Sequence, residues 1–156
     1  MSISHEYKSR ILAISVIAFL SALFLLSVPS NAQTQIIYVN ADRNIEKGQE
    51  AMRDGDYDRA VRYLKKAARG DLASEHKAIV QNSLCASLYF QGAYDEAAIA
   101  CSSAIAENGR YWKAYVNRGN ARKALGDTLG ALSDYCQAHA LSPGHVSGAF
   151  QAQCEG

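Results

Sequence analysis

Small and apolar side chains recur at helical spacing between Ala114 and Pro143, with polar side chains between them. Gly126 and Asp127 divide this stretch near its middle. Glycine tolerates the left-handed conformation that ends a helix, and an aspartate carboxylate accepts hydrogen bonds from the N–H groups that open the next one. Pro143 has no N–H and disfavours helical angles at Ser142, so the second helix ends before it. The stretch therefore predicts two antiparallel helices.

The same pattern occurs three times along the chain. Gly55, Gly92 and Gly126 lie 37 and 34 residues apart, and two sets of small residues keep these intervals. The sets are Ala60, Ala97 and Ala131, and Ala67, Ala104 and Ala138. Units of about 34 residues with two helices each are typical of repeat proteins, which share one core by stacking. We expect the three extra residues between the first two copies to lengthen a polar loop at 70–75.

Each copy matches part of the motif W-x2-L-G-x2-Y, A-x3-F and P. Over residues 41–143 the chain therefore resembles a tetratricopeptide repeat protein, of a small exported bacterial type. The third copy places Tyr115, Arg118, Gly119, Arg122, Ala131, Tyr135 and Pro143 at the motif positions. The second places Gln81, Leu84, Cys85, Leu88, Ala97, Cys101 and Gly109 there. The first places Asn44, Lys47, Gly48, Ala51, Ala60, Leu64 and Leu72 there. The three charged residues and the two cysteines in these lists depart from the family pattern.

The resemblance implies an all-α fold, a right-handed α-solenoid of three helix-turn-helix repeats at 41–73, 78–110 and 112–145. Solenoids need a cap over their last apolar face, and we expect residues 144–156 to form one. An ordinary helical bundle is the alternative.

The N-terminal residues have the pattern of an export signal. Lys8 and Arg10 precede the apolar run Ile11–Val28, and small residues stand one and three places before a cut between Ala32 and Gln33. We therefore expect residues 1–32 to be a signal peptide, 33–40 a loose arm, and the protein to be periplasmic or secreted. The 18 apolar residues are also long enough to cross a membrane, so a membrane-anchored protein is the alternative.

Charge and motif content narrow the function class. Residues 1–32 hold two of the 16 basic and one of the 15 acidic side chains, which leaves 14 of each. This balance predicts no general attraction to nucleic acid, and contact with a membrane is expected only if the N-terminal segment is uncleaved. The chain has no G-x-S-x-G, no phosphate-binding glycine loop and no H-E-x-x-H motif, so we predict neither an enzyme nor a cofactor.

All four cysteines follow the predicted signal, and an even count in an oxidising compartment suggests disulfides. Cys85 lies seven residues before Gly92 and Cys101 nine residues after it, so antiparallel helices hinged there bring the two side by side. Both also replace residues that face each other in the family pattern. Cys136 and Cys154 would then tie the last helix to the cap. Buried free thiols are the alternative for the first pair.

A metal-binding or redox-responsive module is the alternative function. Cys136, His139, His145 and Cys154 are a ligand set that zinc accepts, and the first two share a helix face. However, His139 on the last helical turn also complements the helix dipole without any metal, so we assign no metal site.

The resemblance implies a concave groove lined by the first helix of each repeat, which binds a partner protein or peptide. Tyr89 and Phe90 would be aromatic anchors, and Asn117 and Asn120 would hydrogen-bond a bound backbone. Core packing between repeats is an equal alternative for Phe90. The full set of predicted groove residues is Gln49, Arg53, Asn82, Tyr89, Phe90, Lys113, Asn117, Asn120 and Lys123.

Some relatives, the heat-shock co-chaperones, hold a C-terminal carboxylate in this groove with basic and amide side chains. The matching places here carry Ile45, Gln49, Ser83, Lys113 and Asn117, and only Lys113 keeps a charge, so we do not expect that specific clasp. The opening helix of the third copy is nevertheless basic, and Arg118 and Arg122 share one face, which predicts either a solvated surface or a site for an acidic group. The sequence thus predicts a non-catalytic adaptor, scaffold or assembly factor of the cell envelope.

Overall fold

The computed structural model describes residues 43–145 and Cys154, and every regular element in this part of the chain is an α-helix. The elements are a helix at 43–53, α3 (Tyr57–Ala68), α4 (Ser74–Phe90), α5 (Tyr94–Glu107), α6 (Trp112–Ala124) and α7 (Thr128–Leu141). The predicted all-α fold is confirmed. The predicted signal segment, the arm at 33–40 and most of the predicted cap lie outside the described residues.

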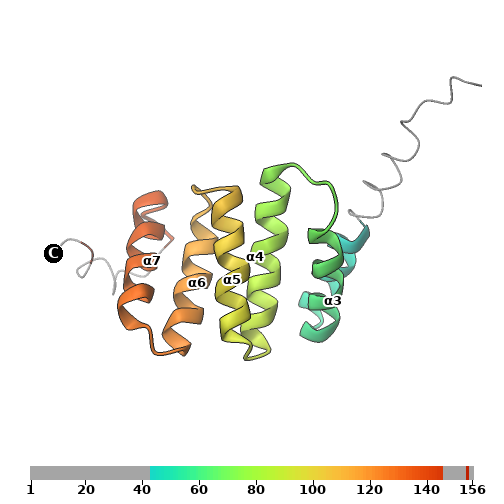
Figure 1. Cartoon of the computed structure of the whole chain (residues 1–156), viewed down its shortest axis with the longest axis horizontal. Helices are drawn as coiled ribbons and strands as arrows, with labels where there is room; N and C mark the ends of the chain where they lie inside the picture. Colours follow the sequence, from blue (N-terminus) through green and yellow to red (C-terminus); the bar gives the residue numbers. More distant parts are fainter. Residues whose placement is uncertain (1–42, 146–153, 155–156) are drawn as a thin grey trace, which may run out of the picture. The chain divides into compact units, whose positions relative to one another are not determined.

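The helices pack in chain order as three antiparallel pairs. Each of α3 to α6 contacts the helix that follows it, and α4 also contacts α6. Figure 1 shows α4, α5, α6 and α7 side by side in that order. Since α4 and α6 are the first helices of consecutive pairs, their contact means that both pairs present their first helices on the same side. This is the helix arrangement of a solenoid.

The turn within each pair has the predicted chemistry. Gly55, Gly92 and Gly126 have φ angles of 74°, 81° and 85°, the left-handed region that a side chain would strain. The carboxylate of Asp127 accepts a hydrogen bond from the backbone N–H of Gly130 at 2.9 Å and so caps α7. These two predictions are confirmed.

Small residues lie where the helices approach one another. Ala60 and Ala97 are fully buried, and Ala131 is 2% exposed. The second alanine set, Ala67, Ala104 and Ala138, is fully buried as well. Side chains of this size let helix backbones come close enough for the larger residues around them to interlock, which is why the spacing repeats.

The loop between the first two copies is longer than its counterpart by one residue only. α4 begins at Ser74, so residues 69–73 connect it to α3, whereas residues 108–111 connect α5 to α6, and most of the extra length lies in α4. α4 has 17 residues where α6 has 13. The cause is local, because Leu72 is 8% exposed and packs in the core, and Glu75 lies in the first turn, where a negative charge stabilises the positive helix end.

Candidate functional site

The predicted groove residues lie on the first helix of each pair. Gln49 and Arg53 are on the helix at 43–53, and both are exposed. Three others are on α4 and four on α6, the two first helices that contact each other. We call this set the first-helix face, namely Gln49, Arg53, Asn82, Tyr89, Phe90, Lys113, Asn117, Asn120 and Lys123.

A hydrogen bond between two amides crosses the first-helix face. The Nδ2 of Asn117 on α6 donates to the Oδ1 of Asn82 on α4 at 2.9 Å, and Asn82 is 9% exposed. An Asn side chain carries two donor hydrogens and an acceptor oxygen. The pair therefore keeps the Nδ2 of Asn82 and the Oδ1 of Asn117 without a partner among the described residues, and these groups match the C=O and N–H of an extended backbone.

Asn120 is held by a residue of the next helix. The hydroxyl of Tyr135 on α7 donates to the Oδ1 of Asn120 at 2.8 Å. Burial raises the pKa of Tyr135 above its usual value, with smaller contributions from Tyr89 and Asp134. A tyrosine phenol is protonated at neutral pH, and this one donates to the Oδ1 of Asn120, so the Nδ2 of Asn120 is the part of that side chain that remains for a ligand.

Aromatic rings gather at the turn end of the first two pairs. Phe90 stacks on Tyr57 with 4.9 Å between ring centroids, and Tyr89 meets the edge of Phe90 at 5.6 Å and Tyr94 at 5.4 Å. Phe90 is 60% exposed, so it is not buried in the core between repeats, which was the alternative role for this residue. The cluster fixes an exposed ring, and exposed rings held in place are good anchors for a partner.

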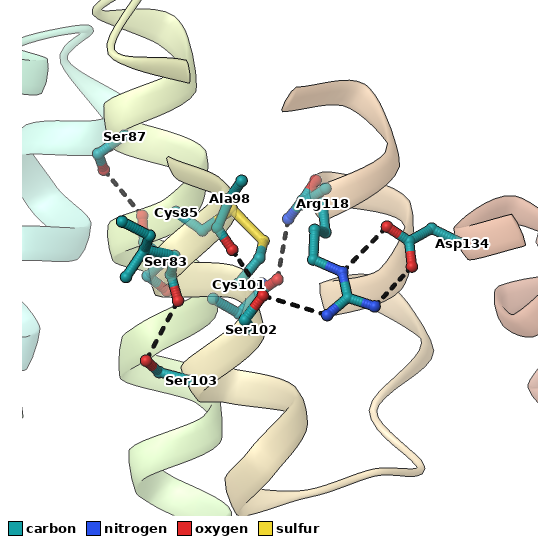
Figure 2. The surroundings of a disulfide bond; sticks show 12 residues. Ser83, Cys85, Ser87, Ala98, Cys101, Ser102, Ser103, Arg118 and Asp134 are labelled. Atoms are coloured by element: carbon teal, nitrogen blue, oxygen red, sulfur yellow. Dashed lines mark hydrogen bonds and ion pairs between the residues drawn. A yellow bond between two sulfur atoms is a disulfide. The ribbon is translucent and has the colours of Figure 1, made fainter. Parts of the chain in front are cut away.

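Lys113 and Lys123 are exposed, whereas the two arginines of the same helix are engaged in the protein. Arg118 donates to the carboxylate of Asp134 through Nη2 at 2.6 Å and Nε at 3.0 Å, and Arg122 donates through Nη1 at 2.8 Å. The Asp134 side chain is 3% exposed. Figure 2 shows Arg118 between Asp134 and Ser102, to whose hydroxyl oxygen it donates at 3.1 Å. The arginines are thus internal packing residues of the third pair, with part of their surface left open.

Sequence reasoning missed Asp134, although a signal for it exists. Arg118 precedes Asp134 by 16 residues, which is also the separation between Cys85 and Cys101. That separation is the distance along the chain between facing positions of one helix pair. Applied to Arg118, it would have identified the carboxylate.

The structure bonds Cys85 to Cys101 and Cys136 to Cys154, with Cα–Cα distances of 5.2 and 5.3 Å. Cys85 and Cys101 are fully buried, and their bridge joins α4 to α5 (Figure 2). The corresponding positions of the other pairs hold a glycine facing a bulky residue. A Cβ on Gly119 would lie 2.7 Å from Cε1 of Tyr135. In the first pair, a Cβ on Gly48 would lie 2.8 Å from Cγ of Leu64.

The residues of the alternative zinc site are not gathered around one point. Cys136 and Cys154 are bonded to each other, and the ring of His145 lies tilted against the ring of Trp112 with 4.8 Å between ring centroids. The Nδ1 of His139 is buried and has no hydrogen-bond partner within the described residues. In that part of the chain no group of three or more His, Cys, Asp or Glu side chains could hold a metal ion. Nor is any helix there long and apolar enough to cross a bilayer.

No family model matches the chain. RNA polymerase II-associated protein 3 of Xenopus tropicalis is 37% identical over 90 residues, which cover 58% of this chain and 13% of that protein. The same protein of Xenopus laevis is 36% identical over 90 residues, with the same coverage. The matched region therefore spans about an eighth of the length of these curated relatives.

Solved structures of repeat domains are similar to a larger share of the chain. The first TPR of Spaghetti (RPAP3) bound to the HSP90 peptide SRMEEVD is 26% identical, with a TM-score of 0.65, over 74% of this chain and 88% of that one. The second TPR domain of human RPAP3 in complex with the HSP70 peptide SGPTIEEVD is 25% identical, with a TM-score of 0.66, over 76% and 95% of the two chains. The Sgt2 TPR domain from Aspergillus fumigatus, at 23% identity and a TM-score of 0.64 over 74% of both chains, supports the fold alone.

Proposed function

We propose that this tetratricopeptide-repeat chain is a non-catalytic protein–protein interaction module that binds a partner peptide or helix on its first-helix face. The observation that carries the proposal is the amide pair of Asn82 and Asn117, which offers a donor and an acceptor side by side where α4 meets α6. The likeness to repeat domains that are bound to HSP90 and HSP70 peptides supports a peptide as the kind of partner.

The first-helix face changes in chemistry along its length, and this gradient defines the kind of partner. The aromatic cluster around Phe90 suits an apolar side chain. The amides of Asn82, Asn117 and Asn120 suit a polar backbone. Lys113 is exposed and suits an acidic group. We therefore infer a segment that carries an apolar residue toward the second pair and a negative charge toward the third.

We do not expect the first-helix face to recognise a free C-terminal carboxylate. The two neighbouring domains are bound to peptides that end in EEVD. In this chain the corresponding places carry Ile45, Gln49 and Ser83, and the amide of Asn117 is already engaged with Asn82. Lys113 is the one basic side chain among these places. We therefore expect a C-terminal carboxylate to bind only slightly more tightly than a carboxylate within a peptide.

A setting outside the cytoplasm fits the two disulfides, the predicted signal peptide and the predicted cut between Ala32 and Gln33. We include it in the proposal, with the module serving as an adaptor, scaffold or assembly factor of the cell envelope. The metal-binding alternative has no support from the arrangement of its residues, because both of its thiols are in a disulfide.

Affinity capture from the native envelope fraction tests whether a partner binds the first-helix face. The bait is the oxidised chain, compared with Tyr89→Ala and Lys113→Glu. The matched control is Leu129→Ser, an 83% exposed residue on α7 outside the first-helix face. We expect both test variants to lose the same partner that the control retains. Equal capture by all four baits would show that the face is assigned wrongly.

Titration with SRMEEVD and with its C-terminal amide tests the carboxylate conclusion. We expect the two peptides to bind this chain with affinities within about a factor of three, a difference of less than 1 kcal/mol. A much tighter complex with the free acid, lost in Lys113→Glu, would mean that the carboxylate clasp is intact after all.

A further inference from the structure

The two disulfides differ in how far solvent reaches them. Cys85 and Cys101 are both 0% exposed, and the bond between them, called the buried bridge, joins α4 to α5. Cys136 on α7 and Cys154 are both partly exposed, and we call their bond the accessible bridge. Thiol–disulfide exchange begins when a thiolate reaches a sulfur atom, so a bridge that solvent reaches can react in the folded protein. The buried bridge reacts only after the helices around it separate.

The two bridges also differ in what they hold together. The buried bridge fills the facing positions of the second pair. In the third pair Gly119 and Tyr135 take those positions, and Cys136 is not one of them. The ion pair of Arg118 with Asp134 joins α6 to α7 as well. We therefore expect the third pair to stay closed when the accessible bridge opens, so that a folded chain with this bridge reduced can exist.

A histidine with an unused ring nitrogen lies one helical turn from Cys136. His139 follows Cys136 by three residues on α7, and side chains at this spacing are neighbours on one helix face. The Nδ1 of His139 is buried and makes no hydrogen bond within the described residues. Since buried polar atoms are nearly always paired, an unpaired one calls for an explanation. A bridged sulfur accepts hydrogen bonds weakly, whereas the thiolate that forms when the bridge opens accepts them strongly.

The place of Cys136 in its helix makes this histidine important. Thiolates are stabilised by a helix N-terminus, a nearby cation or a hydrogen-bond donor. Cys136 lies in the second half of α7, so the dipole of this helix does not stabilise a negative charge there. His139 supplies a donor in each form of its ring that carries a proton on Nδ1, which includes the imidazolium. The helix thus holds a donor beside the sulfur that needs one.

From the exposure of this bond and the histidine beside it, we propose that Cys136–Cys154 is a redox-active disulfide, which accepts two electrons from a dithiol while the buried bridge stays closed. His139 stabilises the Cys136 thiolate and so makes Cys136 the leaving sulfur. None of these three residues belongs to the first-helix face. This activity is therefore separate from the proposed binding of a partner, and either can hold without the other.

The reduction takes place in two displacements. A thiolate of the dithiol attacks the Sγ of Cys154, the bond between Cys154 and Cys136 breaks, and Cys136 leaves as a thiolate that accepts a hydrogen bond from His139. The second thiolate of the dithiol then attacks the dithiol sulfur of the mixed disulfide, and Cys154 leaves. The dithiol becomes a disulfide, and the two protons that its thiols release end on Cys136 and Cys154.

Graded reduction of the folded, oxidised chain by dithiothreitol tests the difference between the bridges. The reaction is stopped with acid, free thiols are alkylated, and peptide mapping by mass spectrometry locates them. We expect thiols at Cys136 and Cys154 to form at least about tenfold faster than thiols at Cys85 and Cys101. As a control, this difference should disappear in urea, where the helices are unfolded. The proposal is overturned if the buried bridge is reduced first or at the same rate, or if the accessible bridge stays closed until the chain unfolds.

Two variants at one position test the histidine. His139→Leu removes the donor, whereas His139→Asn keeps an N–H near the place of Nδ1. We expect the accessible bridge to be reduced about fivefold more slowly in His139→Leu and at nearly the unmodified rate in His139→Asn. In the reduced chain, alkylation by iodoacetamide should become slower at Cys136 in His139→Leu and stay unchanged at Cys154, a difference that a general loosening of α7 would not produce. Equal rates in both variants and in the unmodified chain would refute the role of His139.

Discussion

The second and third helix pairs have the same backbone register but are held together by different chemistry. Where the second pair has the buried Cys85–Cys101 bridge, the third has the ring of Tyr135 packed against Gly119. The first pair resembles the third at this position, because the side chain of Leu64 packs against Gly48. The register of a repeat is thus set by its turn and its alanines, while the facing position accepts any pair of side chains that fills the space.

The layer next to this position differs as well. The second pair has apolar residues, Leu84, Leu88 and Ala100, at the positions where the third has Arg118, Arg122 and Asp134. An apolar layer depends little on pH or salt, whereas an ion network needs its carboxylate charged. The two pairs should therefore respond to different perturbations, the second to reduction and the third to loss of one charge.

The largest expected effect is the loss of the bridge in the second pair. In Cys85→Ala with Cys101→Ala, the free energy of unfolding should fall by about 3 kcal/mol from the lost cross-link, and further because a cavity remains. Urea unfolding followed by circular dichroism measures the change. Cys85→Gly with Cys101→Tyr, which copies the third pair, should recover part of it. An unchanged urea midpoint in the alanine variant would show that the bridge does not stabilise the fold.

The ion network gives the next largest effect. Asp134→Ala leaves two guanidinium groups without their carboxylate, and since both are partly exposed we expect a loss of about 2 kcal/mol. Thermal unfolding checks this value. The triple variant Arg118→Leu, Arg122→Leu, Asp134→Ala copies the second pair and should be as stable as the unmodified chain. If the triple variant is less stable than Asp134→Ala alone, the two layers are not interchangeable.

Close packing in the third pair predicts a smaller loss. Gly119→Ala places a Cβ 2.7 Å from the Tyr135 ring, which must move, at a cost of about 1.5 kcal/mol. Gly109→Ala is the matched control, because its new Cβ would be an ordinary 3.8 Å from the carbonyl oxygen of Ile105. Chemical denaturation of both variants tests the contact. Equal stability of the two would argue that the ring shifts freely.

The smallest effect concerns the hydroxyl of Tyr135. Tyr135→Phe removes its bond to Asn120 and should lower the stability by about 1 kcal/mol. Because the folded state raises the pKa of this phenol, the unfolded chain releases the proton first as the pH rises. The contribution is thus complete below the ordinary tyrosine pKa and is lost as the pH rises through the folded value. Stability measured across the alkaline range should fall less steeply in the variant, and parallel curves would contradict this account.

Local chemistry was enough to predict the turns and the close contacts. A glycine with positive φ, an aspartate cap and alanines at a fixed interval each leave a signal within a few residues, and Gly126, Asp127 and Ala131 follow it. Ending a helix before Pro143 is equally local, and α7 does end at Leu141. These features fix the fold because every copy repeats them.

Contacts between distant residues could not be read in the same way. The bond from Asn117 to Asn82 spans 35 residues, and neither residue indicates its partner. Both were predicted as ligand contacts, but each also positions the other. Two hollows beside Ile99 depend on how α5 sits between its neighbours, and no pattern in one helix predicts such a space. The start of α4 was misplaced because the polar sequence before it resembles a loop as closely as a first helical turn.

The Cys85–Cys101 bridge also sets how the chain would respond to mechanical force. Pulled from its two ends, an oxidised molecule cannot extend the segment between these cysteines, which are 16 residues apart. At about 3.5 Å per residue, that withholds roughly 55 Å of contour length until a reductant is added. The bridge would therefore keep α4 and α5 tethered to each other under a tension that unfolds the neighbouring helix pairs.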